Sequence, residues 1–380
     1  MNSSKKILIY CDNSFQIMMA IHLKRTVLLD DKVDIIITDH INDYKKIYTN
    51  LKKETVFNNV IMMNAYDLDY KKNRFRYPSI KGGYRLNDIK IVLNRKKILK
   101  DLVVLDDTYD EFWATDILDS TNILFDELLK RNKKIKMVFY EESPVSLICD
   151  QHNQFVKKKY DQIDIVRKII YIMVGFKTIT GRYAEAYSSV WEYVKWNKYF
   201  TCRNIPKLRR DDKEYVQVLN RIWDYQYDNK YNGKIIFFEE SFFLNGIECK
   251  DIQIVKDITD VIDKKNVIIK LHPRSRINRF KDLGIEIEKN SSIPWELIAL
   301  NLQGEKNVLI SIATSGMIHP KLYWGIDQNA IALAKCKEYE FEYLKKNKYY
   351  QEYINVCLND KLVEMPTNKT EFVKLLKQYR

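Results

Sequence analysis

Cationic and titratable side chains gather after a short apolar run in the second half of the chain. Val267–Ile269 is a continuous β-branched run, typical of a strand that is buried on both faces. Lys270, His272, Pro273 and Arg274 come directly after it. Because ligands of open α/β sheets bind at the carboxyl ends of strands, these side chains suit a phosphate or another anion. An ordinary basic turn is the alternative that this stretch leaves open.

Two adjacent carboxylates, Glu141 and Glu142, follow the apolar run Ile135–Tyr140. At the end of a buried strand they are poorly solvated and repel one another, so one pKa could be raised toward a value useful for a general base. Side chains alternate between the two faces of a strand, so only one of the pair should point into a cleft. The sequence leaves open which one, and a water-exposed acidic pair is the alternative.

Small hydroxyl residues, Ser311, Thr314 and Ser315, stand between the apolar run Val308–Ile312 and a predicted helix. Their hydroxyl groups, with backbone N–H groups at the helix start, could bind a phosphate. A helix cap explains one of these residues equally well, but it does not explain the whole cluster.

Glu296 lies in the first turn of a predicted helix, Pro294–Asn301, whose proline suits the first turn. A carboxylate at this place in a nucleotide site commonly receives the two ribose hydroxyls. The alternative is an ordinary first-turn glutamate that is favoured by the helix dipole.

The elements that must position these residues alternate between strands and helices. Such an alternation predicts parallel sheets covered by helices. It occurs twice, which predicts an α/β protein of GT-B-like fold class, with two Rossmann-type α/β domains that face each other across a cleft. Neither GxGxxG nor GxxxxGK[ST] is present. The predicted strands are Lys6–Cys11, Lys32–Thr38, Asn59–Ala65, Leu102–Leu105, Ile135–Tyr140, Lys234–Phe238, Val267–Ile269, Gly284–Glu288, Val308–Ile312 and Asn329–Ala334.

Among the predicted helices are Ser14–Leu28, Asp43–Glu54, the amphipathic Glu111–Arg131, Ile163–Val174, Asp251–Lys264 and an exposed Lys337–Leu358. A linker is predicted within Glu185–Arg210, which is rich in Trp, Tyr and Lys. We therefore expect an acceptor-side domain at 1–205 and a nucleotide-sugar domain at 206–345. The helices at 346–380 could pack back on the first domain.

Composition describes a globular protein, with 46% hydrophobic and 30% charged residues among 380. Six cysteines without a CxxC argue for a reducing compartment and against a disulfide framework or a thiolate zinc site. The longest apolar run, Ile169–Phe176, is far shorter than the roughly 20 residues that a membrane span needs. We expect a cytoplasmic protein. The net charge of +13 favours anionic partners or an anionic membrane surface.

The basic segment Asp67–Lys97 interrupts the alternation and contains interleaved aromatic residues. It is predicted to be a solvated surface excursion, with a mobile flap over an anionic acceptor or headgroup as the alternative. Its Asp67 and Asp69 form a DxD, a motif that binds a metal–nucleotide complex in other transferases. Because it stands alone here, we interpret it as a chance occurrence. His319-Pro320 is interpreted as the start of a helix, and no histidine has partners at metal-ligand spacing.

Four motifs together resemble a known family. YEES, KLHPR, IPWEL and SIATSG look like the acidic-pair, HP, Pro-x-Glu and Ser/Thr motifs of bacterial sialyltransferases, in order over roughly Ile135–Gly316. The resemblance is to the lipooligosaccharide sialyltransferase family (glycosyltransferase family 52). It implies a metal-independent, inverting GT-B enzyme that uses CMP-sialic acid as donor and needs no cofactor. One departure is Ser143-Pro144, where the family usually has a glycine after the acidic pair.

The resemblance also implies a role for each motif. Glu141 or Glu142 would remove the proton of the acceptor hydroxyl. His272 would stabilise or protonate the departing CMP phosphate. Glu296 would hold the ribose. The residues expected to contact the phosphate or its surroundings are Lys270, Pro273, Arg274, Ser311, Thr314 and Ser315.

The expected partners are a CMP-sugar donor and an oligosaccharide or glycolipid acceptor of a lipooligosaccharide or capsule. Peripheral association with the anionic inner-membrane surface and a homodimer are left open, and no nucleic acid is expected. Two alternatives remain: a transferase for another CMP-activated acid sugar, and a non-catalytic protein that binds polyanions or membrane through Lys71–Lys97 and the Lys-rich C-terminus.

Overall fold

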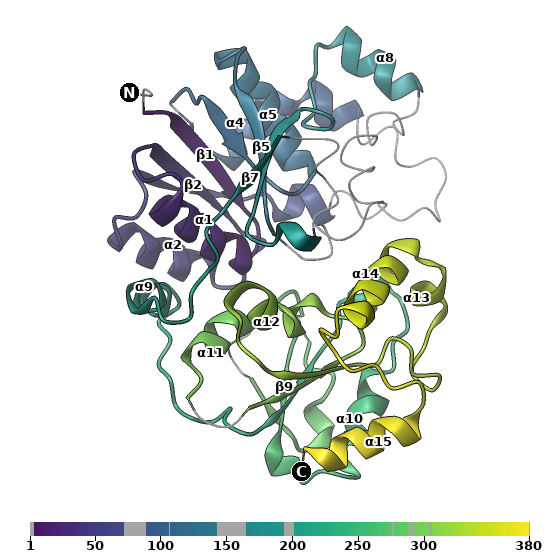
Figure 1. Ribbon diagram of the computed structural model, residues 1–380. Coiled ribbons are helices and arrows are strands. Elements are labelled where there is room, and N and C mark those ends of the chain that lie inside the picture. The colour runs from purple at the N-terminus through teal and green to yellow at the C-terminus, as the bar shows by residue number, and fades with distance from the viewer. Residues whose placement is uncertain are drawn as a thin grey trace. The chain divides into compact units, whose positions relative to one another are not determined.

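The computed structural model describes residues 4–71, 89–105, 107–142, 165–193, 201–275, 277–288, 290, 292–303 and 306–379. The described residues up to Pro206 form one compact unit, and those from Lys207 onward form a second. Each unit has its own parallel sheet with helices around it (Figure 1). Ser143-Pro144 and most of the segment 67–97 lie outside the described residues.

The first unit is built on a seven-stranded sheet in the order β3-β2-β1-β4-β5-β6-β7, and every neighbouring pair is parallel. The order reverses at β1 and β4, which makes this the switch point where ligands of open α/β sheets bind. The strands are β1 (Lys6–Cys11), β2 (Lys32–Thr38), β3 (Asn59–Met63), β4 (Glu111–Trp113), β5 (Lys136–Tyr140), β6 (Tyr183–Ser188) and β7 (Thr201–Asn204).

Helix α1 (Ser14–Thr26) follows β1 and begins at Asn13, whose side chain accepts a hydrogen bond of 2.9 Å from the Gln16 backbone N–H. Its residues from Phe15 to Leu23 are all buried, so the helix lies inside the unit rather than on its surface. The other helical elements of this unit are α2 (Tyr44–Lys53), η1 (Asp67–Lys71), α4 (Arg95–Leu102), α5 (Asp119–Arg131), α8 (Ile165–Met173) and η2 (Trp191–Tyr193).

The second unit has a five-stranded parallel sheet in the order β10-β9-β8-β11-β12, with its switch point between β8 and β11. Its strands are β8 (Ile235–Phe238), β9 (Val267–Lys270), β10 (Glu286–Ile287), β11 (Val308–Ser311) and β12 (Asn329–Ala332). Its helical elements are α9 (Lys213–Trp223), η3 (Phe242–Asn245), α10 (Asp251–Thr259), η4 (Lys264–Asn266), η5 (Lys281–Leu283), α11 (Trp295–Asn301), η6 (Ser315–Met317), α12 (His319–Trp324), α13 (Glu342–Lys346), α14 (Lys348–Asn359) and α15 (Lys369–Gln378).

The fourth strand of the first sheet corrects the sequence prediction. Leu102–Leu105 is not a strand: Leu102 ends α4, and Val104 is exposed. The strand is Glu111–Trp113, which was predicted to begin an amphipathic helix. Glu111 can be buried there because its carboxylate pairs with the ammonium of Lys5 at 2.7 Å and accepts a hydrogen bond from the Trp113 indole. Local periodicity could not reveal this pairing, because Lys5 lies about a hundred residues away in the sequence.

Two further differences concern the ends of the predicted domains. Strands β6 and β7 lie largely in the segment Glu185–Arg210, which was interpreted as a linker, since their polar sequences lack an apolar run. The predicted helix Lys337–Leu358 is instead two helices, α13 and α14, that are separated at Asn347. Helix α15 belongs to the second unit, where Lys369 pairs with Asp257 at 2.8 Å. Contact of these helices with the first unit stays a prediction, as does a cleft between the units.

No helix of the described residues is long and apolar enough to cross a membrane.

Candidate functional site

Glu141 is a buried carboxylate that the protein itself satisfies. It follows β5 and accepts hydrogen bonds from the Ser188 hydroxyl at 2.7 Å, the Ser189 backbone N–H at 2.7 Å and the Ser189 hydroxyl at 2.6 Å. Burial raises the pKa of Glu141 to about 7, although the three hydrogen bonds act in the opposite direction. Glu141 therefore joins the end of β5 to the turn after β6.

Glu142, one residue later, has a different environment. Its side chain is half-buried and accepts one hydrogen bond of 3.0 Å from the Asn13 amide, which also lies 3.3 Å from an Asp12 carboxylate oxygen. Burial and the nearby charge of Asp116 raise the pKa of Glu142 well above its usual range. Glu142 is thus the less enclosed member of the pair, and its role as a base stays a prediction.

Asp12 and Asp116 complete a group of three carboxyls that the sequence analysis missed. Asp12 follows β1, Asp116 follows β4 and Glu142 follows β5, and these strands are parallel neighbours, so all three lie at one edge of the sheet. Burial, then the charges of Asp116 and Glu142, raise the pKa of Asp12 well above its usual range. Asp12 could have been found from the sequence, because it directly follows the apolar strand β1. Asp116 could not, because β4 was not predicted to be a strand.

The DxD residue Asp69 is engaged in a buried structural network. Its carboxylate accepts hydrogen bonds from the Ser120 backbone N–H at 3.0 Å and the Ser120 hydroxyl at 2.6 Å, and lies 3.3 Å from the His40 ring. His40 also contacts the Thr38 hydroxyl at 2.8 Å. These contacts join the ends of β2 and η1 to the start of α5. Among the described residues, no group of three His, Cys, Asp or Glu side chains is arranged to hold a metal ion.

In the second unit, Lys270 ends β9 and His272 follows two residues later, and the two side chains have different surroundings. Lys270 is buried, and its ammonium donates a hydrogen bond of 2.7 Å to the Ile293 carbonyl, which holds the segment before α11. Burial lowers the pKa of Lys270 to about 8. His272 is half-buried, and its backbone N–H donates to Glu239 at 3.0 Å. Contact of Lys270 with a donor stays a prediction.

The ring of His272 is positioned as a neutral hydrogen-bond donor. Its Nδ1 accepts a hydrogen bond of 3.1 Å from the Arg274 backbone N–H, so the proton of the neutral ring is carried on Nε2. Burial, reinforced by the Arg274 charge, lowers the pKa of His272 to about 3. Of the two roles left open by the sequence, this environment favours hydrogen bonding to a phosphate over protonation of it. Pro273 is exposed and Arg274 is half-buried beside the ring.

A second acidic pair, Glu239 and Glu240, follows β8 and was also missed, although it stands after an apolar run just as Glu141 and Glu142 do. Glu240 accepts hydrogen bonds of 2.7 Å from both the Ser311 hydroxyl and the Ala313 backbone N–H. Burial raises the pKa of Glu240 to about 7. Ser311 is therefore turned toward the protein and shapes the loop after β11.

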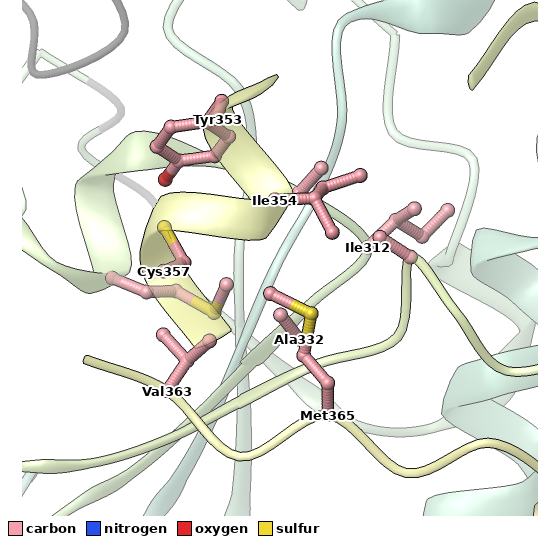
Figure 2. A pocket seen from close by; sticks show the side chains of 10 residues that line it. Ile312, Ala332, Tyr353, Ile354, Cys357, Val363 and Met365 are labelled. Carbon is pink, nitrogen blue, oxygen red and sulfur yellow. The ribbon is translucent and has the colours of Figure 1, made fainter. Parts of the chain in front are cut away.

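Thr314 and Ser315 are half-buried at the start of η6, on the loop that Glu240 holds. The preceding part of this loop is packed against α14: Ile312 lines a small apolar cavity of about 10 Å³ with Ile354 and Met365 (Figure 2). Because the loop is held on one side by Glu240 and on the other by α14, the two hydroxyl residues that follow have a defined position.

Glu296 and His319 form a buried pair that the sequence analysis did not foresee. Glu296 is in the first turn of α11, and its Oε1 lies 2.5 Å from Nδ1 of His319. The prediction that His319 starts a helix is confirmed, since it is the first residue of α12. The contact orients the Glu296 carboxylate. Binding of a ribose by Glu296 stays a prediction.

Together the second-unit residues suit an anion at one sheet edge. His272 follows β9, Glu240 follows β8, and Thr314 and Ser315 follow β11, and these strands are parallel neighbours. A neutral imidazole N–H, two hydroxyls and backbone N–H groups are phosphate-binding groups. The first unit, taken by itself, has a cluster of carboxyls with raised pKa values at the carboxyl edge of its own sheet.

No protein-family model matches the chain, and no curated protein matches it in sequence. Solved structures resemble it in fold. The glycotransferase of kitacinnamycin is 9% identical, with a TM-score of 0.50 over 99% of this chain and 91% of that one. The α/β-galactoside α-2,3-sialyltransferase of Photobacterium phosphoreum is 13% identical, with a TM-score of 0.44 over 96% and 99%.

A glycosyltransferase of Streptomyces sp. SF2575, in complex with thymidine diphosphate, is 10% identical, with a TM-score of 0.43 over 98% of this chain and 99% of that one. At these identities the resemblance concerns the fold alone. The likeness to the kitacinnamycin protein and the two parallel-sheet units confirm the GT-B-like fold class that the alternation of elements predicts.

Proposed function

We propose that the protein is an inverting glycosyltransferase that moves sialic acid from CMP-sialic acid to a hydroxyl of a surface glycan, a lipooligosaccharide or a capsule. The GT-B-like fold supports sugar transfer in general, and the four motifs support the choice of donor. The observation that carries the proposal is the neutral His272 ring, held with its proton on Nε2 at the same sheet edge as Thr314 and Ser315.

In the second unit, the donor phosphate would accept hydrogen bonds from His272 Nε2–H, Thr314 and Ser315. These groups stabilise the negative charge that develops on the phosphate as the bond to the sugar breaks. Glu296, oriented by His319, would receive the ribose hydroxyls. Hydrogen-bond donors would supply all of this charge stabilisation, so the proposed reaction needs no metal ion.

In the first unit, Glu142 would act as the base. The acceptor oxygen attacks the anomeric carbon, the bond from that carbon to the phosphate oxygen breaks, and its electron pair leaves with CMP. The acceptor proton passes to the Glu142 carboxylate. A carboxylate with a raised pKa is a stronger base than an ordinary one, which suits this role. Glu141 is a poorer candidate, because three protein donors already occupy its oxygens.

The test is transfer from CMP-sialic acid to a galactose-terminated oligosaccharide, in the presence of a chelator, by the wild type and three variants. The wild type should be active. His272→Ala should lose about 10²–10³ in kcat, the usual effect of removing one transition-state donor. His272→Gln should recover part of the loss, since its amide N–H can occupy the Nε2 position. An exposed substitution in the same unit, Lys281→Ala, serves as the control.

Three results would count against the proposal: full activity of His272→Ala, a requirement for added metal, or no turnover of CMP-sialic acid. Turnover of another CMP-activated acid sugar in place of CMP-sialic acid would support the assigned site but change the identity of the donor. Binding of polyanions that falls steeply with salt and is unchanged in His272→Ala, without turnover of any CMP-sugar, would indicate a non-catalytic basic protein.

A further inference from the structure

Large apolar side chains are exposed on one side of the first unit, around α4, α5 and α8. Met173 is 79% exposed, Val104 74% and Ile172 67%. Leu93 and Ile169 are also among the exposed large apolar residues. Scattered exposed apolar residues are ordinary, but a group of them on adjacent elements marks an interaction surface.

Contacts of Arg95 join the segments on which several of these residues lie. Its guanidinium donates to the Val174 carbonyl after α8 at 2.8 Å, to the Val92 carbonyl before α4 at 2.7 Å, and to Asp126 of α5 at 2.9 Å. The ring of Phe176 also packs against it, with a centroid distance of 5.7 Å. Met173 directly precedes Val174 and Leu93 directly follows Val92, so both exposed residues adjoin carbonyls that Arg95 binds. Figure 1 shows α8 at the outer edge of this unit.

A groove of about 550 Å³ lies between α4 and α5, and the exposed Val104 is part of its lining. Its apolar lining includes Leu99, Val103 and Leu105, and its charged lining consists of four cationic residues against one acidic residue, Glu127. The cationic residues are Lys96, Lys100, Lys130 and Arg131. Two of these are already paired within α5, Lys130 with Asp126 and Arg131 with Glu127.

The cations of α4 differ from those of α5. Lys96 and Lys100 are exposed and one helical turn apart, and within the described part of the chain neither forms an ion pair. Two ammonium groups that have no ion-pair partner among the described residues therefore lie beside the apolar lining of the groove and the exposed Val104.

We propose that this α4–α5–α8 surface binds an anionic lipid bilayer. Apolar residues of α8 and Val104 would enter the boundary between headgroups and acyl chains, and Lys96 and Lys100 would contact lipid phosphates. The combination of cationic and exposed aliphatic side chains favours a bilayer over a protein. The cations match the anionic headgroups, and the aliphatic side chains match the apolar layer directly beneath them. The inference goes beyond sugar transfer and does not depend on it.

Vesicle flotation of the full-length protein tests the proposal. Wild-type protein should float with phosphatidylcholine vesicles that contain about one third phosphatidylglycerol, and much less with phosphatidylcholine alone. Lys96→Glu with Lys100→Glu should weaken binding to the anionic vesicles at least about tenfold, since each cation near such a surface contributes to attraction. Ile172→Asp with Met173→Asp should weaken binding on both the anionic and the neutral vesicles.

Matched controls exist in the same unit. Lys52→Glu with Lys53→Glu makes an equal change of net charge on exposed residues of α2, and Leu29→Asp places a charge at another exposed apolar residue. Both should bind anionic vesicles like wild type. Circular dichroism identifies any variant that fails to fold, and Lys96→Ala with Lys100→Ala then replaces the charge reversal.

The proposal is overturned if the α4 and α8 variants float like wild type. It is also overturned if the α2 control loses as much binding as the α4 variant, which would indicate attraction through net charge alone.

Discussion

At the scale of single residues, neighbouring carboxylates acquire different chemistry from their surroundings. Glu141 and Glu142 have the same side chain and the same strand end, yet Glu141 is saturated with protein donors and Glu142 accepts one hydrogen bond from Asn13. Burial raises both pKa values, and Asp116 adds repulsion only at Glu142. The two residues have the same type, so only their environments distinguish them, and these environments are the reason that Glu142 is the proposed base.

Asp116→Asn should move the rising limb of the pH–rate profile to lower pH. Asp116 disfavours the charged form of Glu142, so removing that charge lowers the Glu142 pKa, and the base becomes competent at a lower pH. The measurement is kcat/KM for sialic acid transfer across pH, with the exposed Asp101→Asn as control. An unchanged limb in Asp116→Asn would show that the limb reports another group.

At the scale of elements, buried carboxylates hold the ends of strands together. Glu141 joins the end of β5 to the turn after β6, and Glu240 joins the end of β8 to the loop after β11. In each sheet, a glutamate that follows an apolar strand binds backbone N–H groups of a neighbouring connection. Glu142 directly follows Glu141 in one unit, Thr314 directly follows Ala313, which Glu240 holds, in the other, and both are half-buried.

Glu141→Ala should lower the free energy of unfolding of the first unit by about 2–4 kcal/mol, because Ser188 and Ser189 lose their buried acceptor. Glu141→Gln should change the pH dependence of stability. The folded pKa of about 7 lies above the usual 4.5, so the stability that Glu141 contributes is fully present below about pH 4.5 and is lost as pH rises through about 7.

Urea unfolding of the wild type and Glu141→Gln at pH values from 4 to 8 measures this effect. The glutamine variant should show a smaller decline in stability over that window, while Glu240 and the Asp12 cluster keep part of the decline in both proteins. Equal slopes in the two proteins would contradict the assigned pKa.

At the scale of the whole molecule, the chain consists of two units, each with its own sheet, core and switch point. The proposed chemistry is divided between them: the carboxyl cluster lies in the first unit and the proposed phosphate-binding groups lie in the second. Part of the basic excess has a distinct setting, because Lys96 and Lys100 line a groove together with the exposed Val104, whereas Lys52 and Lys53 are exposed on α2.

CMP should increase protection against amide hydrogen exchange in the second unit, at the ends of β9 and β11, and leave the strand ends of the first unit nearly unchanged. Binding to the native state stabilises the segments that must open for exchange, by about 2.7 kcal/mol at a hundred times the Kd. His272→Ala should reduce the protection. Protection confined to the first unit would reverse the assignment of the two units to acceptor and donor.

Much of the fold could be predicted from the sequence. The predicted bounds Lys6–Cys11 and Lys32–Thr38 match β1 and β2, because long β-branched runs have few alternatives to a buried parallel strand. The strands β4, β6 and β7 were missed because β4 has only three residues and β6 and β7 lack a continuous β-branched run, so their strand character depends on the partners beside them. The predicted edge positions of Glu142, His272 and Thr314 followed from the strands that were assigned correctly.

The sequence by itself determined where polar chemistry stands, at the ends of apolar runs. Only the tertiary structure decided what each group does there: that Glu141 is saturated by Ser188 and Ser189, and that His319 orients Glu296. The reason is physical. Apolar periodicity is a local property of the chain, whereas burial, hydrogen-bond partners and neighbouring charges come from residues tens to hundreds of positions away, and these set the pKa and the orientation of a side chain.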